Sequence, residues 1–181
     1  MKHSAHTPVI CLLVASLSGC AYQPPKDVNS TFYSPPAGSK LQLHSALTIP
    51  ANNTEVYIQD GKVISSYWSI DAYYPNCNFE LRERAEVKRR VQPDTFTIFR
   101  VVRNTENVML GTPTVVASSS SGNGAPNVDF MIIMDLHSER QPGVMRITCR
   151  QWEDPSDGNH LSIVQIRKTL GDLFTLRLPD A

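Results

Sequence analysis

The sequence predicts a mainly β fold, an antiparallel sandwich or small barrel of about eight strands with one short C-terminal helix. From residue 41 onward, apolar residues recur at every second position through most of the chain, which is the spacing of half-buried strands. Turn signals such as Asp60-Gly61 separate these stretches, and Pro (13) outnumbers Gly (9), which favours loops and edge strands over a helical bundle. Clear helical spacing occurs once, close to the C-terminus.

The first expected strands lie between residues 41 and 70. Residues 41–47 carry leucines of one parity, and a turn is expected at 51–53. Alternation across 56–58 leads into Asp60-Gly61, a strong β-hairpin signal, and apolar residues across 64–70, Trp68 among them, continue the return strand.

The clearest pattern covers residues 77–91, which we interpret as one long strand with a buried and a solvated face. Apolar residues occupy the odd positions Cys77, Phe79, Leu81, Ala85, Val87 and Val91. Polar or charged residues occupy every even position, and only Glu83 and Arg89 break the apolar parity, so a bend or bulge is expected there. After a turn at 92–94, residues 95–103 are expected to return as the second strand of a hairpin.

The C-terminal half predicts two strands, a helix and a last strand. Residues 130–134 are apolar on both faces, as in a central strand, and residues 144–152 form another strand. Apolar residues at 163, 166 and 170 have helical spacing, and Gly171 supplies a stop. Residues 174–178 alternate again, as a last strand.

The N-terminus predicts a secretory leader. Residues 9–17 form an apolar run that is too short to span a bilayer, which takes about 20 residues, but has the length of a signal-peptide core. Leu17-Ser18-Gly19-Cys20 follows directly, and this segment resembles the lipobox of bacterial lipoprotein precursors. The resemblance implies that residues 1–19 are removed, that Cys20 carries a diacylglycerol, and that a further acyl chain such as palmitate is added to the new N-terminus. Several acyl chains anchor a protein firmly.

The lipobox resemblance also implies an address. Residue 21 is Ala rather than Asp, which in enteric-type bacteria implies an outer-membrane lipoprotein facing the periplasm, with the inner membrane less favoured. The alternative is an ordinary cleaved signal with a coincidental cysteine. Residues 20–40 contain two Pro-Pro pairs and almost no aliphatic residues, so we expect a flexible tether there and a single folded domain at 41–181.

Cysteine usage predicts one disulfide bond. Cys11 leaves with the leader and Cys20 takes the lipid, so Cys77 and Cys149 remain as a pair in an oxidising compartment. Each lies on the apolar parity of its strand, so both should point into the same core. Two separate buried thiols are the alternative, whereas metal binding and a redox-active CxxC do not fit the spacing.

Charge gives no argument for a nucleic-acid partner, because Lys+Arg and Asp+Glu are 17 each. Residues 82–90 look basic, with Arg82, Arg84, Lys88, Arg89 and Arg90, but glutamates are interleaved. Two readings remain open for this stretch: a solvated, edge-protecting strand face, or a site for an anionic partner.

Aromatic residues gather before Cys77, namely Tyr67, Trp68, Tyr73 and Tyr74. They are candidates for a partner-binding surface, because exposed aromatic side chains make good anchors. The alternative is that they close the end of the sheet. His44, His137 and His160 are widely separated, and surface or structural histidines are the default expectation for them.

Catalytic and cofactor motifs are absent from the sequence. No GxSxG, HExxH or GxxxxGK[ST] occurs, so we expect no cofactor, no metal and no enzymatic activity. The acidic loop Asp154–Gly158 fails as a calcium loop, because an EF-type register places Pro155 at a ligand position, and we interpret it as a turn that caps the following helix. The serine-rich stretch 118–127 is expected to be a flexible loop.

The segments LTIPANNTEVYIQDG (47–61) and YYPNCNFEL (73–81) resemble segments of small proteobacterial lipoproteins of unknown function, which implies a shared fold and no activity. We therefore expect a non-enzymatic envelope lipoprotein that binds a protein or another envelope component. A small β-barrel carrier of an apolar ligand is the alternative, and an envelope hydrolase a weaker one.

Overall fold

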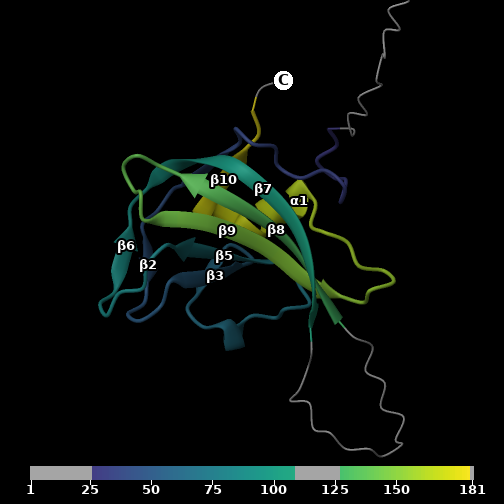
Figure 1. Ribbon diagram of the computed structural model, residues 1–181, viewed down its shortest axis with the longest axis horizontal. Helices are drawn as coiled ribbons and strands as arrows, with labels where there is room; N and C mark the ends of the chain where they lie inside the picture. The colour runs from purple at the N-terminus through teal and green to yellow at the C-terminus, as the bar shows by residue number, and fades with distance from the viewer. Residues whose placement is uncertain (1–25, 109–126, 180–181) are drawn as a thin grey trace, which may run out of the picture.

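The computed structural model describes residues 26–108 and 127–179 (Figure 1). The leader, the Leu17–Cys20 lipobox with its lipidation site Cys20, and nearly all of the serine-rich stretch lie outside the described residues.

The described residues contain ten strands, one α-helix and two short 3-10 helices. The strands are β1 (Lys40–Leu43), β2 (Leu47–Ile49), β3 (Glu55–Gln59), β4 (Lys62–Ile64), β5 (Asn76–Leu81), β6 (Arg89–Val91), β7 (Asp94–Val108), β8 (Asn127–His137), β9 (Val144–Glu153) and β10 (Phe174–Arg177). The helices are η1 (Tyr67–Ser69), α1 (Ile163–Leu170) and η2 (Gly171–Leu173).

Eight of these strands form one antiparallel sheet in the order β10-β1-β7-β8-β9-β5-β3-β4, and β2 pairs with β6 in a separate two-stranded sheet. The large sheet curves into a half-barrel, and α1 lies behind β7, β8 and β9 in the view of Figure 1. We call the concave side, which holds α1, the inner face, and the convex side the outer face. The predicted fold class, mainly β with one short C-terminal helix, is confirmed.

Three phenylalanines show how strongly the sheet curves. Phe79 of β5, Phe96 of β7 and Phe174 of β10 come from strands that are not neighbours in the sheet, yet their rings meet on the inner face. The ring centroids of Phe79 and Phe96 are 5.8 Å apart, and those of Phe79 and Phe174 are 5.6 Å apart. All three are buried, so the inner face is a filled core.

Helix α1 completes this core. Its apolar stripe, Ile163, Ile166 and Leu170, is fully buried, which confirms the helical spacing of the sequence. The helix begins at a capping box, in which the Ser162 hydroxyl accepts the backbone N–H of Gln165. This cap, rather than the Asp154–Gly158 turn, starts the helix, so the expected capping role of that turn is wrong.

The C-terminus of α1 is joined to the β3–β4 hairpin at the far edge of the sheet. Gly61 donates its backbone N–H to the carbonyl of Thr169 at 2.9 Å. A Cβ on Gly171 would lie 2.6 Å from the Cα of Gly61, so this approach requires glycine. Asp60 and Gly61 both have positive φ, 51° and 72°, as a tight hairpin turn requires, and the predicted hairpin is confirmed.

The predicted single strand over 77–91 is wrong. β5 ends at Leu81, because its partner β9 begins at Val144, opposite Leu81, and the residues beyond have no ladder to join. Val87, placed by parity on the buried face, is 68% exposed. Residues 89–91 instead form β6 and pair with β2.

The predicted hairpin between this strand and residues 95–103 is also wrong. β7 pairs with β1 on one side and β8 on the other. A register shift between Ile98 and Arg100 places Phe99 in a bulge. The strands predicted at 130–134 and 144–152 are confirmed, since β8 lies in the middle of the sheet and β9 beside it.

The expected disulfide forms between β5 and β9. Cys77 and Cys149 are directly opposite each other in the ladder, with Cα atoms 4.0 Å apart, and their sulfurs are bonded. Both cysteines are fully buried on the inner face, as their parity predicted.

Residues 26–39, expected to belong to a flexible tether, instead pack on the domain. Val28 accepts the backbone N–H of Val164 at the start of α1, and Val28 and Tyr33 are partly buried against the core. Gly38 donates its backbone N–H to the carbonyl of Ile98 in β7 at 2.8 Å. The ordered domain therefore begins well before residue 41, because local main-chain hydrogen bonds and two apolar side chains hold this proline-rich segment.

Candidate functional site

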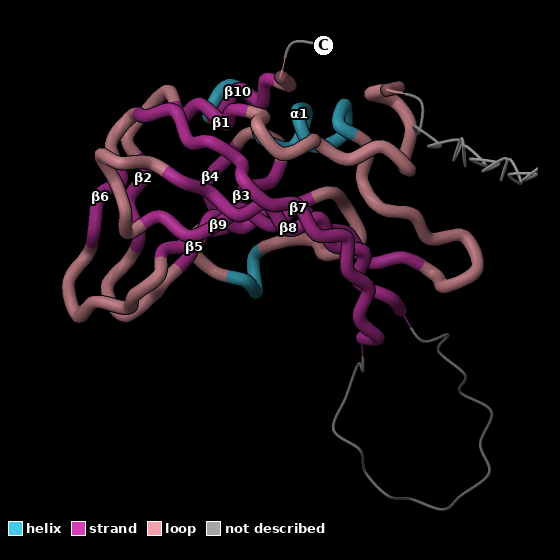
Figure 2. Tube along the Cα trace, turned by 45° about the horizontal axis from the view of Figure 1, so that its top comes forward, coloured by secondary structure: helices cyan, strands magenta, loops and turns pink. Residues whose placement is uncertain are grey.

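The aromatic segment, residues 65–75, connects β4 to β5 on the outer face of the sheet. Figure 2 shows its 3-10 helix η1 and helix α1, both cyan, on opposite sides of the strands. Tyr67 packs edge-on against Tyr57 of β3, with ring centroids 5.7 Å apart. Trp152 of β9 donates its backbone N–H to the carbonyl of Ala72 at 2.8 Å. The segment therefore lies across β3, β5 and β9.

The side-chain amide of Gln59, the last residue of β3, fixes this segment. Its Nε2 donates to the carbonyl of Asp71 at 2.9 Å, and its Oε1 accepts the backbone N–H of Asp71 at 3.1 Å. The same Nε2 donates to the carbonyl of Tyr74 at 3.4 Å. Contacts to β3 and β9 thus hold the loop in one conformation, which reduces the ordering cost of binding.

Three of the four candidate aromatic side chains are exposed. Trp68 is 91% exposed, Tyr74 65% and Tyr73 51%, whereas Tyr67 is half-buried against Tyr57. The alternative that these rings close the end of the sheet therefore applies to Tyr67 alone. Trp68 also does not lie on the return strand of a hairpin, because β4 ends at Ile64 and Trp68 belongs to η1.

Two hollows flank Trp68. The first, the polar hollow, has a volume of ≈ 440 Å³. Its lining consists of Asn52, Asn53, Thr54, Glu55, Tyr57, Ser65, Ser66, Tyr67, Trp68 and Arg84. The second, the apolar hollow, has a volume of ≈ 530 Å³ and is lined by residues 67–73 and Trp152. Trp68 and Tyr67 line both, so the indole of Trp68 is the wall between them.

A chain of polar side chains runs beneath the aromatic segment. Glu55 accepts hydrogen bonds from the hydroxyl of Tyr57 and from Nδ2 of Asn78, the latter at 2.6 Å. Arg150 donates to Oδ1 of Asn78 at 3.3 Å and to Oδ2 of Asp129 at 3.0 Å. These five residues lie on the outer face of four adjacent strands, β3, β5, β9 and β8. The chain links these four strands through side chains, although Oδ1 of Asp129 at its end is buried without a hydrogen-bond partner among the described residues.

Burial sets the protonation of this chain. Burial raises the pKa of Tyr57, and its hydrogen bond to Glu55 raises it further, so the phenol remains a donor at neutral pH. Burial also raises the pKa of Tyr67. Burial raises the pKa of Asp129 as well, and the nearby guanidinium of Arg150 opposes that effect.

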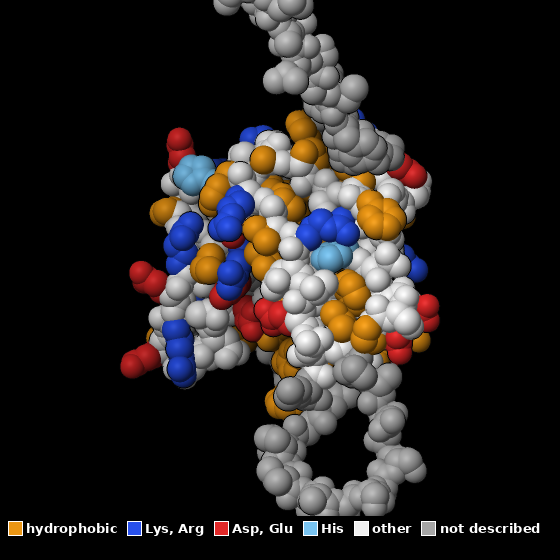
Figure 3. Space-filling model, turned by 45° about the vertical axis from the view of Figure 1, so that its right-hand side comes forward, with side chains coloured by type: hydrophobic (Ala, Val, Ile, Leu, Met, Phe, Trp, Pro, Cys, Tyr) orange, Lys and Arg blue, Asp and Glu red, His pale blue; other side chains and the backbone are white. Residues whose placement is uncertain are grey.

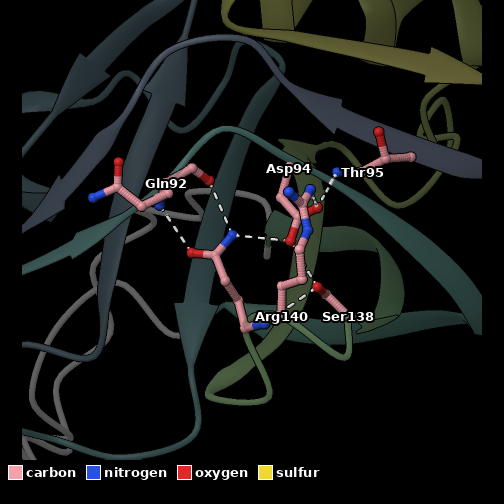
Figure 4. A network of polar contacts seen from close by, with 6 residues as sticks. Gln92, Asp94, Thr95, Ser138 and Arg140 are labelled. Carbon is pink, nitrogen blue, oxygen red and sulfur yellow. Dashed lines mark hydrogen bonds and ion pairs between the residues drawn. The ribbon is translucent and has the colours of Figure 1, made fainter.

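A second polar network surrounds Asp94 at the start of β7 (Figure 4). Ser138 donates to its carboxylate at 2.7 Å and Gln141 at 3.1 Å, and Arg140 forms an ion pair with it. Burial by itself would raise the pKa of Asp94, but these three hydrogen bonds and one from the backbone N–H of Thr95 lower it to about 2. The carboxylate of Asp94, next to the β6–β7 turn, accepts hydrogen bonds from residues of the β8–β9 turn, so its role is structural.

The same network joins the β6–β7 turn to the β8–β9 turn. Gln141 exchanges two hydrogen bonds with the backbone of Gln92, at 2.8 and 3.0 Å. Figure 4 shows these contacts beside the Asp94 cluster.

The three histidines lie in three separate places. Nε2 of His44 is 2.7 Å from the hydroxyl of Thr175, and His137 is exposed at the end of β8. Nδ1 of His160 lies 3.1 Å from Arg103, and its Nε2 lies 3.1 Å from the carbonyl of Asn104. Arginine only donates, so Nδ1 accepts and Nε2 carries the proton, and this imidazole is neutral. Among the described residues, none of the three histidines is hydrogen-bonded to a serine or cysteine.

The basic stretch 82–90 is dispersed rather than gathered. Arg84 lines the polar hollow, while Arg89 donates to the carbonyl of Asn53 at 3.1 Å and Arg82 to that of Pro142 at 3.2 Å. Basic and acidic side chains lie side by side on the face of the molecule shown in Figure 3. The separate surroundings of Arg82, Arg84 and Arg89 favour the solvated reading of the stretch over a site for an anionic partner.

Within residues 26–108 and 127–179, no helix is both long and apolar enough to cross a membrane. The same part of the chain holds no group of three or more His, Cys, Asp or Glu side chains arranged to bind a metal ion. Comparison with protein-family models, with curated proteins and with solved structures finds no match to this chain.

Sequence reasoning identified the exposed aromatic side chains of the site. It missed the chain of polar side chains beneath them and the residues that line the polar hollow. Glu55, Asn78, Asp129 and Arg150 follow the polar parity of their strands, which predicts contact with water. The one available signal was Tyr57, a large aromatic residue on the polar parity of β3, which indicates that something covers that face.

Proposed function

We propose that this chain is the precursor of a bacterial lipoprotein, and that its domain is a non-enzymatic binding module for a protein or another component of the cell envelope. The Leu17–Cys20 lipobox directly after a signal-peptide core supports the anchor at Cys20. The Cys77–Cys149 disulfide supports an oxidising compartment such as the periplasm. Ala21 supports the outer membrane as the address, with the domain facing the periplasm.

The observation that carries the binding function is the exposed Trp68 between two hollows on a rigid face. An indole that is 91% exposed is removed from water only where it meets Tyr67, so burial of Trp68 contributes little to the fold of the isolated domain. Large aromatic side chains bury much area on binding and lose little rotamer freedom, so they are favourable anchors.

The carrier alternative fits this architecture less well. A lipocalin-like carrier needs a hollow interior, whereas the inner face is filled here by α1 and the phenylalanines Phe79, Phe96 and Phe174. Within the described residues, the hollows on the outer face are therefore better placed for a ligand than the inside of the half-barrel.

Site-specific photocrosslinking in cells tests the binding function. We would place p-benzoylphenylalanine at Trp68 or at Tyr74, and at Phe32 as a matched control, because Phe32 is a 79% exposed aromatic residue away from the site. We expect adducts from positions 68 and 74 and none from position 32.

A second variant makes the experiment decisive. The adduct from position 74 should disappear when Trp68→Ala is added, because the partner then loses its main anchor. Adducts of equal yield from all three positions, or no adduct to either a protein or a glycan from positions 68 and 74, would refute the proposed binding surface.

A further inference from the structure

We infer that the ligand of this surface is a glycan, and that the two hollows on either side of Trp68 hold consecutive units of an N-acetylated oligosaccharide. The inference rests on the proposed binding function and specifies the class of ligand. It follows from the hydrogen-bonding character of the polar hollow, the absence of net charge in the lining of that hollow, and the stacking surface of Trp68.

The polar hollow offers groups that both donate and accept. Asn52, Asn53, Ser65 and Ser66 line it, and their side chains make no hydrogen bond to another described residue. An amide or a hydroxyl side chain presents a donor and an acceptor together, which matches a ligand hydroxyl, itself both donor and acceptor. A surface dense in such free groups suits a polyhydroxylated ligand.

The charge of the hollow excludes strongly charged ligands. One carboxylate, Glu55, and one guanidinium, Arg84, line it, so their formal charges cancel. Glu55 is moreover engaged by Tyr57 and Asn78. A phosphate site would present several uncompensated donors, and an ammonium site would present a free carboxylate. The lining therefore favours a neutral ligand.

Trp68 supplies a stacking surface that is held from behind. Its indole packs edge-on against Tyr67 at 5.8 Å, and Tyr67 packs in the same way against Tyr57 at 5.7 Å. The chain of rings ends on β3, so the exposed indole is supported by the sheet. The negative face of an aromatic ring attracts the polarised C–H groups of a pyranose ring, which gives a flat sugar its apolar contact.

The apolar hollow extends the site beyond one sugar. It begins on the other side of Trp68 and ends at Tyr73 and Trp152, whose rings meet edge-on at 5.9 Å. An N-acetyl group carries a methyl that suits this lining and an amide that hydrogen-bonds. An N-acetylated sugar chain lying across Trp68 thus uses both hollows.

A peptide partner is less well matched to this surface. Strand addition needs a free sheet edge, whereas the polar hollow is lined by β3 and loop residues and the apolar hollow by residues 67–73 and Trp152 of β9. The edge strand nearest to them, β4, is only three residues long. A peptide is therefore an outcome that the test must be able to report.

The test is calorimetric titration of the full chain, purified in detergent, with N,N′,N″-triacetylchitotriose. Both tryptophans of the sequence, Trp68 and Trp152, line the hollows, so intrinsic fluorescence reports on the same event. We expect saturable binding, weakened about tenfold or more by Trp68→Ala and about threefold or more by Asn53→Ala. Phe32→Ala, at an exposed ring elsewhere, should leave the Kd within about twofold.

The outcomes separate the inference from the proposed function. No saturable binding of the trisaccharide up to about 10 mM, together with a protein adduct from position 68 in cells, overturns the glycan and retains a protein-binding surface. Neither binding nor an adduct overturns both. Binding of equal strength in wild type and Trp68→Ala overturns the site. Where Trp68→Ala does weaken binding, an unchanged melting temperature, as expected for an exposed residue, excludes misfolding as the cause.

Discussion

Opening the Cys77–Cys149 disulfide should remove roughly 4 kcal/mol of the free energy of unfolding, because its cysteines are 72 positions apart and the chain-entropy relation gives about that value for such a loop. Both cysteines are fully buried among apolar side chains, where a reduced thiol packs as a small hydrophobe. The native state therefore loses little on reduction, and the change falls on the unfolded ensemble.

The assays compare urea unfolding and thermal unfolding of the oxidised and the reduced wild-type protein, which differ only in this bond. For a domain of this size, roughly 4 kcal/mol corresponds to a fall in melting temperature on the order of 10–15 °C. The Cys77→Ala/Cys149→Ala variant is the control, since its unfolding should not respond to reductant. Equal midpoints for oxidised and reduced wild type, or two free thiols in protein purified from the periplasm, would refute this reasoning.

Three further predictions concern the anchor, the site and pH. Cys20→Ser should shift the protein out of the membrane fraction, and continued membrane fractionation with normal cleavage would contradict the lipobox assignment. Phe79→Ala should cost about 3–5 kcal/mol by denaturant unfolding and Tyr74→Ala less than about 1, because only the first ring is in the core. Burial and the charge of Arg103 lower the pKa of His160 from its ordinary value of 6.5, so its neutral form favours the fold. Stability should therefore be full above about pH 6.5 and decline as the pH falls below it, and His160→Gln should flatten that decline in a pH series of thermal melts.

Alternation predicted which residues face the core far better than it predicted which strands pair. Cys77, Phe79 and Leu81 are buried as their parity requires, and the apolar parity resumes after Glu83 at Ala85, Val87 and Val91. Nothing in that pattern reports that the partner strand β9 begins at Val144, opposite Leu81. Strand partners depend on contacts distant in sequence, so the break and the transfer of residues 89–91 to a second sheet could not be inferred locally.

The site was predictable in part for a similar reason. An aromatic cluster is visible in the sequence, but exposure depends on whether another element covers it, and only the fold shows Trp68 uncovered. The polar chain through Asn78 and Asp129 was hidden, because polar residues at alternate positions indicate a wet face. In the folded domain the aromatic segment covers this face of the sheet, so Asn78 and Asp129 are buried and do not face water.

The position of α1 and β10 after all other strands has a consequence for how the molecule is made. β1 needs β10 on one side, in a ladder that pairs Lys40 with Arg177, and the inner face needs the side chains of α1. A chain that leaves a ribosome or a translocation pore from its N-terminus therefore exposes most of its core until the C-terminal elements emerge. Such late closure leaves apolar surface exposed on an unfinished chain, which makes that chain prone to aggregation until the C-terminal elements are made. It also means that a product cut short before residue 163 is a target for proteolysis rather than a smaller working domain.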